Sequence, residues 1–440
     1  MKNNPSAAMV YCFGEKGNYV AGIRVKLYEA VDAEILNRAV NTAIKRFPYL
    51  AFQVKDGEDG LFVLEKNDRP VCVFDDLHDH VMLTEQSNYH ALNLEVNGKE
   101  IIFNTGHFMA DGKSMMEWVK SVLYYYLCEF YGTELDPESI RTLSDEIPAE
   151  ERNDPLKPYV ERAMRKIQEK DDGEPVFTPS YQGRSLAFED IKGLCGLNDY
   201  VDINGNARMC SFWVSSADFM KLARVNDGSP ATFTAAVMTK ILRERRPDLN
   251  KNITASILED LRPGLGTPLA HHSLISRIKV TYTPEAADKD VETLSTMARG
   301  KVILETEPEA YQRTREGVAG VCAAAFALPD HKTRFDLMYR DLPTENFNVS
   351  YVGMIPFGAV EKYVDELYVV IPPTPDYLTI EINYINGKLL FMFSQCFDDT
   401  YFVKHFMGFF ESNGIEVHNY REAQMRHPLI DMTAPLLRKK

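Results

Sequence analysis

The sequence predicts two α/β sandwich domains of similar size. Three observations predict this fold class: the 440 residues are 45% hydrophobic, helices and strands alternate in both halves, and a polar, acidic stretch rich in Pro and Gly separates the halves between about 134 and 205. This alternation favours mixed sheets covered by helices over one long array. We place an N-terminal domain at 1–178, a crossover at 179–208 and a C-terminal domain at 209–440.

Signals in the N-terminal half mark where helices and turns begin and end. Asp32 is typical of a helix N-cap, and Pro48 helps to end the helix that follows. The pair Asn97-Gly98 predicts a tight hairpin turn, and Gly132 is a typical C-cap. The predicted elements are strands at 21–28, 61–65, 89–96 and 100–105, and helices at 33–47 and 113–131.

The C-terminal half repeats this alternation. Ser216 is expected to cap a short helix, and Ser229-Pro230 begins a longer one with Pro at its first position. Asn386-Gly387 predicts a second hairpin. The predicted elements are strands at 209–214, 253–258, 275–283, 347–352, 378–385 and 388–394, a helical pattern over 288–326, and a last helix at 399–412.

Composition excludes several classes of protein. A net charge of −15 disfavours a nucleic-acid surface, because clustered positive charge holds a phosphate backbone. No stretch approaches the roughly 18 apolar residues of a membrane span, and residues 1–5 lack the apolar core of a secretion signal, so we expect a cytoplasmic protein. The seven cysteines are scattered, and His271-His272 lacks further ligands at helical distance, so no metal site is expected.

The segment His107-Phe108-Met109-Ala110-Asp111-Gly112 is the candidate for chemistry. The pattern H-x-x-x-D is weak alone, and a second copy occurs at 427–431. Context favours the first copy, because it follows the predicted strand at 100–105 and leads into a long amphipathic helix. An imidazole with an unperturbed pKa of about 6.5 can accept a proton from a hydroxyl, amine or thiol near neutral pH. The alternative is a structural histidine.

Asp111 and Gly112 have more than one interpretation. Asp111 either orients the His107 ring, as in a Ser-His-Asp arrangement, or holds the loop through a distant arginine. Gly112 is expected to allow a close backbone approach or an unusual backbone angle. A serine-nucleophile scheme finds less support, since no G-x-S-x-G elbow occurs. Lys113, beside the motif, is expected to be solvated.

These residues resemble a known family. Segment 107–112 resembles the HxxxDG motif of the superfamily that contains chloramphenicol acetyltransferase, alcohol acetyltransferases, plant hydroxyl acyltransferases and the condensation domains of peptide synthetases. Residues 31–50, which end in Arg-Phe-Pro-Tyr-Leu, resemble the family's first helix and its R-x-P-x-L ending. Residues 260–263 resemble its N-L-R-P segment, and 347–353 its later S-N-x-G strand. The four segments occur in the family's order, and the stretch from the first to the last spans most of the chain.

The resemblance implies two chloramphenicol-acetyltransferase-like domains with a tunnel at their interface. A coenzyme A thioester is then a co-substrate, with no tightly bound cofactor, and His107 takes a proton from the acceptor without an acyl-enzyme. Asp111 is expected to pair with an arginine, for which Arg262 is the candidate. An oxyanion needs a donor about 3 Å away, for which Ser350 is the first candidate and Asn348 the second.

Departures from the family pattern separate its branches. Gly106 stands where condensation domains usually have another histidine, which favours an alcohol acetyltransferase-like enzyme that moves an acyl, most simply acetyl, group to a hydroxyl or amine. Tyr351 stands where the family commonly has asparagine. Two alternatives stay open: a condensation-domain-like transferase whose partner is an acyl carrier protein, and a catalytically degenerate member that binds an acyl ligand.

Overall fold

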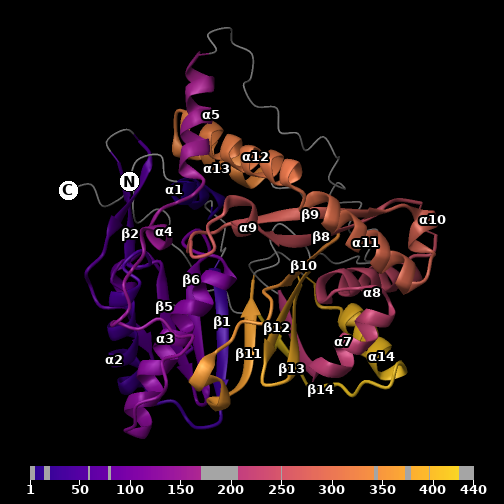
Figure 1. The fold of residues 1–440 in the computed structure, drawn as a ribbon, viewed down its shortest axis with the longest axis horizontal. Helices are drawn as coiled ribbons and strands as arrows, with labels where there is room; N and C mark the ends of the chain where they lie inside the picture. Colours follow the sequence, from indigo (N-terminus) through magenta and orange to yellow (C-terminus); the bar gives the residue numbers. More distant parts are fainter. Residues whose placement is uncertain are drawn as a thin grey trace.

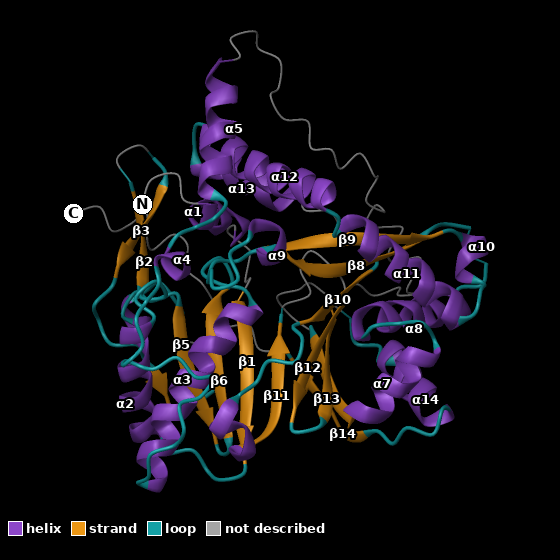
Figure 2. Cartoon of the chain, in the orientation of Figure 1, coloured by secondary structure: helices purple, strands orange, loops and turns teal. Residues whose placement is uncertain are grey.

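The chain folds into two large mixed sheets with helices packed around them. The computed structural model describes residues 5–13, 20–57, 60–77, 81–169, 207–248, 250–340, 345–371, 378–395 and 397–425. Figure 1 shows the two sheets side by side, and Figure 2 separates the strands from the helices around them. The predicted α/β class is confirmed. The predicted crossover at 179–208 lies outside the described residues except for its last two, and the second H-x-x-x-D copy at 427–431 lies wholly outside them.

The first sheet has the strand order β11-β1-β6-β5-β4. All its neighbouring strands are antiparallel except the pair β4 and β5. Helices α2 and α3 pack against each other and bury their apolar residues in the same core as this sheet. The elements are β1 (Val20–Leu27), α2 (Ala33–Ala43), β4 (Val73–Phe74), β5 (Leu92–Asn97), β6 (Glu100–Gly106), α3 (Gly112–Tyr131) and β11 (Val364–Val370).

The second sheet has the order β14-β7-β13-β12-β10-β8-β9. Strand β10 is parallel to both of its neighbours, and the other pairs are antiparallel. A second apolar core joins one face of this sheet to α7, α8, α11 and α14. The elements are β7 (Arg208–Ser215), α7 (Ser216–Val225), α8 (Pro230–Arg245), β8 (Ile253–Asp260), β9 (Ile275–Tyr282), α11 (Val291–Glu305), β10 (Phe347–Tyr351), β12 (Leu378–Ile385), β13 (Lys388–Gln395), α14 (Tyr401–Ser412) and β14 (His418–Gln424).

Smaller elements surround the sheets. A helical group above them in Figure 1 contains α5 and α12, which pack against each other. No helix among the described residues is long and apolar enough to cross a membrane. The remaining elements are α1 (Pro5–Met9), β2 (Phe52–Asp56), β3 (Phe62–Lys66), α4 (Ala149–Arg152), α5 (Lys157–Glu169), α9 (Arg262–Leu265), α10 (Pro284–Ala287), α12 (Pro308–Ala327), α13 (His331–Arg340) and four short 3₁₀ turns at 10–13, 44–46, 85–87 and 358–363.

Strand β11 connects the two halves of the chain. It follows the second sheet's β10 in sequence, yet it pairs with β1 at the edge of the first sheet. Its Glu366 is fully buried and forms ion pairs with Lys26 of β1 at 3.0 Å and Arg421 of β14 at 2.8 Å. The first sheet therefore contains a strand from the predicted C-terminal domain. The domain boundaries at 178 and 208 stay a prediction.

Most predicted caps are present. The Asp32 carboxylate accepts hydrogen bonds from the first-turn backbone of α2, and Gly132 ends α3 with a φ of +61°. The prediction that Ser216 caps α7 is wrong by one residue. Ser215, still extended at the end of β7, is the N-cap, because its hydroxyl accepts from the N–H of Asp218 three residues on.

Candidate active site

A tight turn at the end of β6 carries His107. The N–H of Gly106 donates to the carbonyl of Ala91 at 2.7 Å, and the N–H of Met109 donates back to the carbonyl of Gly106 at 3.0 Å. The side chains of Phe108, Met109 and Ala110 are buried in the first core. The turn is thus fixed on both sides, and the His107 side chain, 8% exposed, lines a pocket.

Burial favours the neutral form of the His107 ring. Loss of solvent lowers the pKa of His107, and the nearby Arg277 charge acts in the same direction. Hydrogen bonds from the ring to backbone carbonyls of His107 and Ala110, together with the Asp111 charge, partly oppose this shift in pKa. A ring nitrogen that donates to a carbonyl leaves the other nitrogen as a proton acceptor, so the imidazole is suited to act as a base near pH 7.

Asp111 uses both carboxylate oxygens to hold the loop. Oδ1 accepts from the N–H of Ser114 at 3.0 Å and so caps α3. Oδ2 accepts from the N–H of Leu274 at 3.0 Å and lies 2.8 Å from Nη2 of Arg262. Asp111 therefore holds the loop through a distant arginine, which is one of its two interpretations. That arginine is Arg262, the partner that the family resemblance implied.

Arg262 joins the two sheets at this point. Its side chain is 2% exposed, and it lies just after β8 of the second sheet. Nη1 donates to Asp260 at 2.9 Å, and Nη2 also donates to the Ser114 hydroxyl of α3 at 2.6 Å. Nε donates to the carbonyl of Ala270 at 2.8 Å. One buried guanidinium thus ties the end of β8 and the loop before β9 to the start of α3.

Gly112 lies at the site but not for the expected reason. It is the first residue of α3, and its backbone does not adopt a positive φ. A Cβ there would meet Val352 at 3.6 Å, which is an ordinary contact. The expectation of an unusual angle or a forced close approach is therefore wrong: Asp111 makes the turn as an extended N-cap, and a helical residue follows it.

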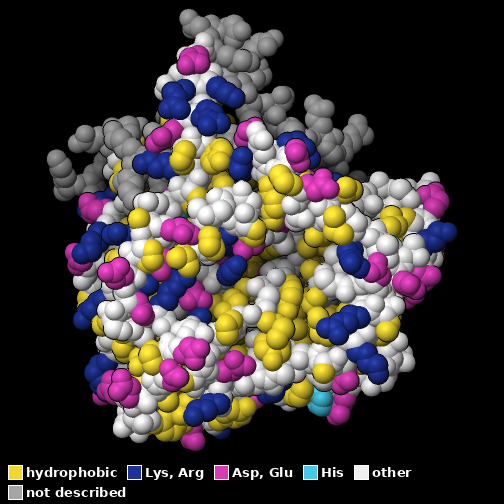
Figure 3. Space-filling model, in the orientation of Figure 1, with side chains coloured by type: hydrophobic (Ala, Val, Ile, Leu, Met, Phe, Trp, Pro, Cys, Tyr) yellow, Lys and Arg dark blue, Asp and Glu magenta, His cyan; other side chains and the backbone are white. Residues whose placement is uncertain are grey.

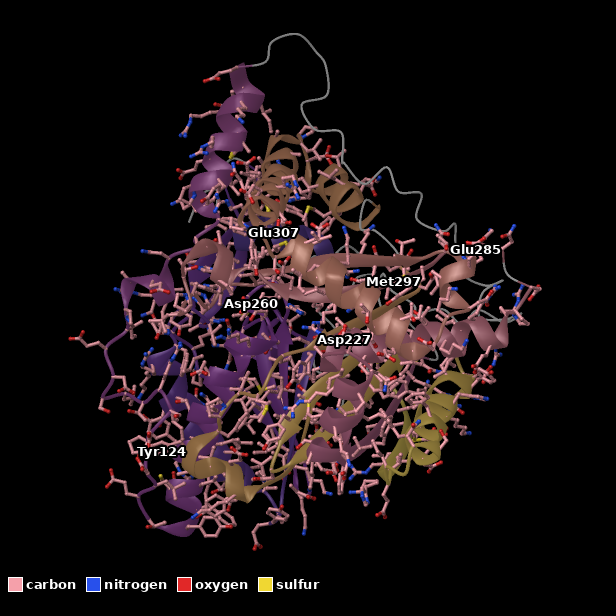
Figure 4. All side chains as sticks on the ribbon, turned by 45° about the vertical axis from the view of Figure 1, so that its right-hand side comes forward. Tyr124, Asp227, Asp260, Glu285, Met297 and Glu307 are labelled. Carbon is pink, nitrogen blue, oxygen red and sulfur yellow. The ribbon has the colours of Figure 1, made fainter. Side chains whose placement is uncertain are left out.

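The pocket brings all six predicted site residues together at the junction of the sheets. Its empty volume, including its opening to solvent, is about 810 Å³. Figure 3 shows a hollow near the middle of this face with hydrophobic side chains beside it, and Figure 4 labels Asp260, one of the lining residues. The lining residues are His107, Asp111, Gly112, Lys113, Leu258, Glu259, Asp260, Arg262, Ile275, Arg277, Asn348, Ser350, Tyr351, Val352, Val369, Ile371 and Glu381.

Sequence reasoning missed two buried carboxyls in this pocket. Glu381 of β12 is 2% exposed, hydrogen-bonds the Ser350 hydroxyl, and has its pKa raised by burial to about 7. Glu259 of β8 is 6% exposed, and burial also raises its pKa to about 7. Glu381 stands between Ile380 and Ile382 in an apolar strand, which is the signal that would have identified it.

Lys113 is exposed, as expected, with 48% of its side chain accessible to solvent, and its Nζ lies 2.8 Å from Oδ2 of Asp260. Asp260 therefore contacts two of the three cations that line the pocket, Lys113 and Arg262. The third, Arg277, lies 3.3 Å from Glu345.

The R-x-P-x-L segment packs against the loop that Arg262 binds. Arg46 Nη1 lies 2.8 Å from Glu151 Oε2, and the Tyr49 hydroxyl donates to the same oxygen at 2.9 Å. The Tyr49 ring stacks on His271 with centroids 3.8 Å apart. His271 belongs to the loop whose carbonyls at 270 and 272 accept from Arg262. No metal-binding cluster occurs among the described residues.

Comparisons with known proteins find the fold but no sequence relative. No family model matches the chain, and no curated protein matches it. Among solved structures, F. graminearum TRI101 complexed with ethyl coenzyme A matches with a TM-score of 0.57 at 12% identity, over 94% of this chain and 98% of that one.

Two further structures agree. The TRI3 trichothecene 15-O-acetyltransferase from Fusarium sporotrichioides matches with a TM-score of 0.56 at 11% identity, over 92% of each chain. The condensation domain from the monacolin K polyketide synthase MokA matches with a TM-score of 0.56 at 12% identity, over 92% of this chain and 94% of that one. The chain therefore has the fold shared by these acetyltransferase and condensation-domain structures, which is the fold that the sequence resemblance predicted.

Proposed function

We propose that the protein is an acyltransferase that moves an acyl group from a coenzyme A thioester to a hydroxyl or amine, with His107 as general base. One observation carries the proposal: the buried imidazole of His107, whose pKa is lowered by burial, lines a pocket between the two sheets together with candidate oxyanion donors from the opposite wall. The likeness in fold to a coenzyme A-bound structure and an acetyltransferase supports the choice of donor. A passage open at both ends remains a prediction.

The proposed reaction needs only one proton carrier. The free nitrogen of His107 removes the proton from the acceptor as the acceptor's oxygen or nitrogen bonds to the thioester carbonyl carbon. The carbonyl oxygen becomes an oxyanion. When this intermediate collapses, the carbon–sulfur bond breaks, the thiolate leaves, and the imidazolium returns the proton to sulfur. No acyl-enzyme forms, and the ring ends neutral.

Ser350 is the proposed donor to the oxyanion. Its side chain lines the pocket from β10, and its hydroxyl can turn from Glu381 toward the reacting carbonyl. Ser350→Ala is expected to lower kcat by about 10²–10³, the usual effect of removing one such donor. Asn348→Ala, two residues earlier on the same wall, is the matched variant and should cost less. A larger loss in Asn348→Ala would move the role to that residue.

The pH dependence of the rate should report the lowered pKa of His107. The base must be neutral to accept a proton, so kcat/KM falls only when pH drops below this pKa. Because burial lowers the pKa from its ordinary 6.5, the acid limb is expected below pH 6.5. Rates with a neutral alcohol as acceptor, measured from about pH 5 to pH 8, test this. A limb centred above pH 6.5 would contradict it.

The donor is tested by release of free thiol. Acetyl-coenzyme A and longer acyl esters are offered with a panel of alcohols and amines, and thiol is measured at steady state. The fold is shared with a condensation domain, so the same acyl groups are also offered on a phosphopantetheine carrier protein. Turnover from the carrier alone would favour the carrier-dependent transferase. Binding of both donors without turnover, in wild type and His107 variants alike, would favour a degenerate member.

A further inference from the structure

We propose that the pocket beside His107 takes an acceptor that carries a protonated nitrogen, and that Glu381 binds this ammonium group. The inference rests on the proposed acyl transfer and narrows its acceptor to an amino alcohol or a diamine. The group that His107 deprotonates is then one end of the acceptor, and the ammonium is the other.

Three polar side chains form one patch of the pocket wall. Glu381 of β12 is in register with Ser350 of the parallel strand β10, and Asn348 lies two residues earlier on β10. Side chains alternate along a strand, so these three share a face, while Val349 and Ile380 point into the second core. All three polar residues line the same pocket as His107.

The pocket offers buried hydrogen-bond acceptors that lack donors. Oδ1 of Asn348 and Oε1 of Glu259 are buried with no hydrogen-bond partner, and their residues are 4% and 6% exposed. Glu381 is 2% exposed and has the Ser350 hydroxyl as a partner. Within the described parts of the chain, neither Glu259 nor Glu381 forms an ion pair. A buried acceptor without a donor costs free energy until a ligand supplies one.

The cations of the pocket are already engaged. Arg262 pairs with Asp111 and Asp260, and Lys113 pairs with Asp260. Arg277 lies 3.3 Å from Glu345. The carboxyls that remain uncompensated in the pocket are those of Glu259 and Glu381, so a ligand with positive charge is complementary to it. The raised pKa of Glu381 agrees, since burial without a cation favours the protonated acid.

An ammonium group matches this wall better than a neutral group. It has three donors and no acceptor, so it can bond both the Glu381 carboxylate and Oδ1 of Asn348. A hydroxyl has one donor and leaves one of these acceptors unfilled. Once the ammonium holds Glu381, the Ser350 hydroxyl is released from that carboxylate and can donate to the oxyanion. Binding of the correct acceptor would thus prepare the proposed oxyanion donor.

The test compares aminopentanol with hexanol, in which a methyl group replaces the ammonium. With acetyl-coenzyme A as donor, kcat/KM for aminopentanol is expected to exceed that for hexanol by about 30-fold or more, the effect of a buried, hydrogen-bonded charge pair. Glu381→Gln, which keeps the shape of the side chain, should bring the ratio close to one. Glu259→Gln is the matched control, a second buried pocket carboxyl, and should retain the preference.

Each outcome decides the proposal. The proposal is overturned if hexanol is used as well as or better than aminopentanol, or if the preference for aminopentanol is unchanged in Glu381→Gln. Loss of this preference in Glu259→Gln instead of Glu381→Gln overturns the assignment to Glu381. Absence of thiol release with every acceptor would refute the acyl transfer itself. In that case thermal unfolding without donor still decides the ammonium site: a higher Tm with aminopentanol than with hexanol, lost in Glu381→Gln, supports it, and no difference overturns it.

Discussion

His107→Ala is expected to lower kcat by about 10²–10⁴-fold, the range for loss of a positioned general base, with little change in acceptor KM. The ring is the proton acceptor of the proposed reaction, and no other histidine lines the pocket among the described residues. The variant also leaves a small cavity beside a buried turn. His107→Gln fills more of that space without a basic nitrogen, so it should lose activity to a similar extent while staying closer to the wild-type stability.

The measurement is steady-state thiol release at saturating donor, with thermal unfolding of each variant. His405→Ala is the matched control, since this histidine lies on α14 away from the pocket and bonds the carbonyl of Tyr401. It should keep the wild-type rate. Full activity in a folded His107→Gln protein would remove the imidazole from the mechanism and leave only the fold in common with the acetyltransferases.

Arg262→Met is expected to cost about 3–5 kcal/mol of unfolding free energy, because it leaves the Asp111 carboxylate buried without its cation. The two side chains are 2% and 3% exposed, so water cannot replace the lost partner. Asp111→Asn should show a loss of similar size, since the guanidinium then loses one of its anions. Urea unfolding measures these losses, and the rate should fall with them because the same pair holds the loop beside His107.

Two further variants test whether the loss of stability comes from leaving a buried charge unpaired. The double variant Asp111→Asn/Arg262→Met should lose less than the sum of the single losses, because the second change removes the charge that the first left unpaired. The surface pair Arg243–Asp288 is the control, with Asp288 59% exposed. Arg243→Met should cost at most about 1 kcal/mol. Equal effects at both pairs would mean that the Asp111–Arg262 contact adds nothing through its burial.

Local signals in the sequence predicted most elements near the site. The helix that begins at Asp111 and ends at Gly132 has a cap at each end and an apolar stripe between them, so neighbouring residues alone determine it. The same holds for the hairpin of β12 and β13 about Asn386-Gly387. Two of the strands that were not predicted, β11 and β14, pair with partners far away in the chain, and no hairpin turn ties them to those partners.

The residues of the candidate site also fall into a locally predictable part and a part that depends on distant segments. The segment from His107 to Gly112 is continuous in sequence, so the motif was visible. The opposite wall comes from β8, β10 and β12, and the family resemblance, not any local pattern, pointed to Arg262, Asn348 and Ser350. Glu381 has no counterpart in the quoted motifs. Its position between Ile380 and Ile382 signals a buried carboxyl, but only the register of β10 and β12 places it beside Ser350.

Strand β11 belongs to the second half of the chain but pairs with β1 of the first sheet, so the two halves depend on each other during synthesis. Until residue 370 has left the ribosome, β1 presents an open row of backbone donors and acceptors at the border of its sheet, and such a border invites pairing with other chains. A fragment cut after residue 208 would keep that border open and should aggregate, whereas supplying the remaining fragment in the same cell could restore solubility. The turn that carries His107 would therefore be secured only after most of the chain has been made.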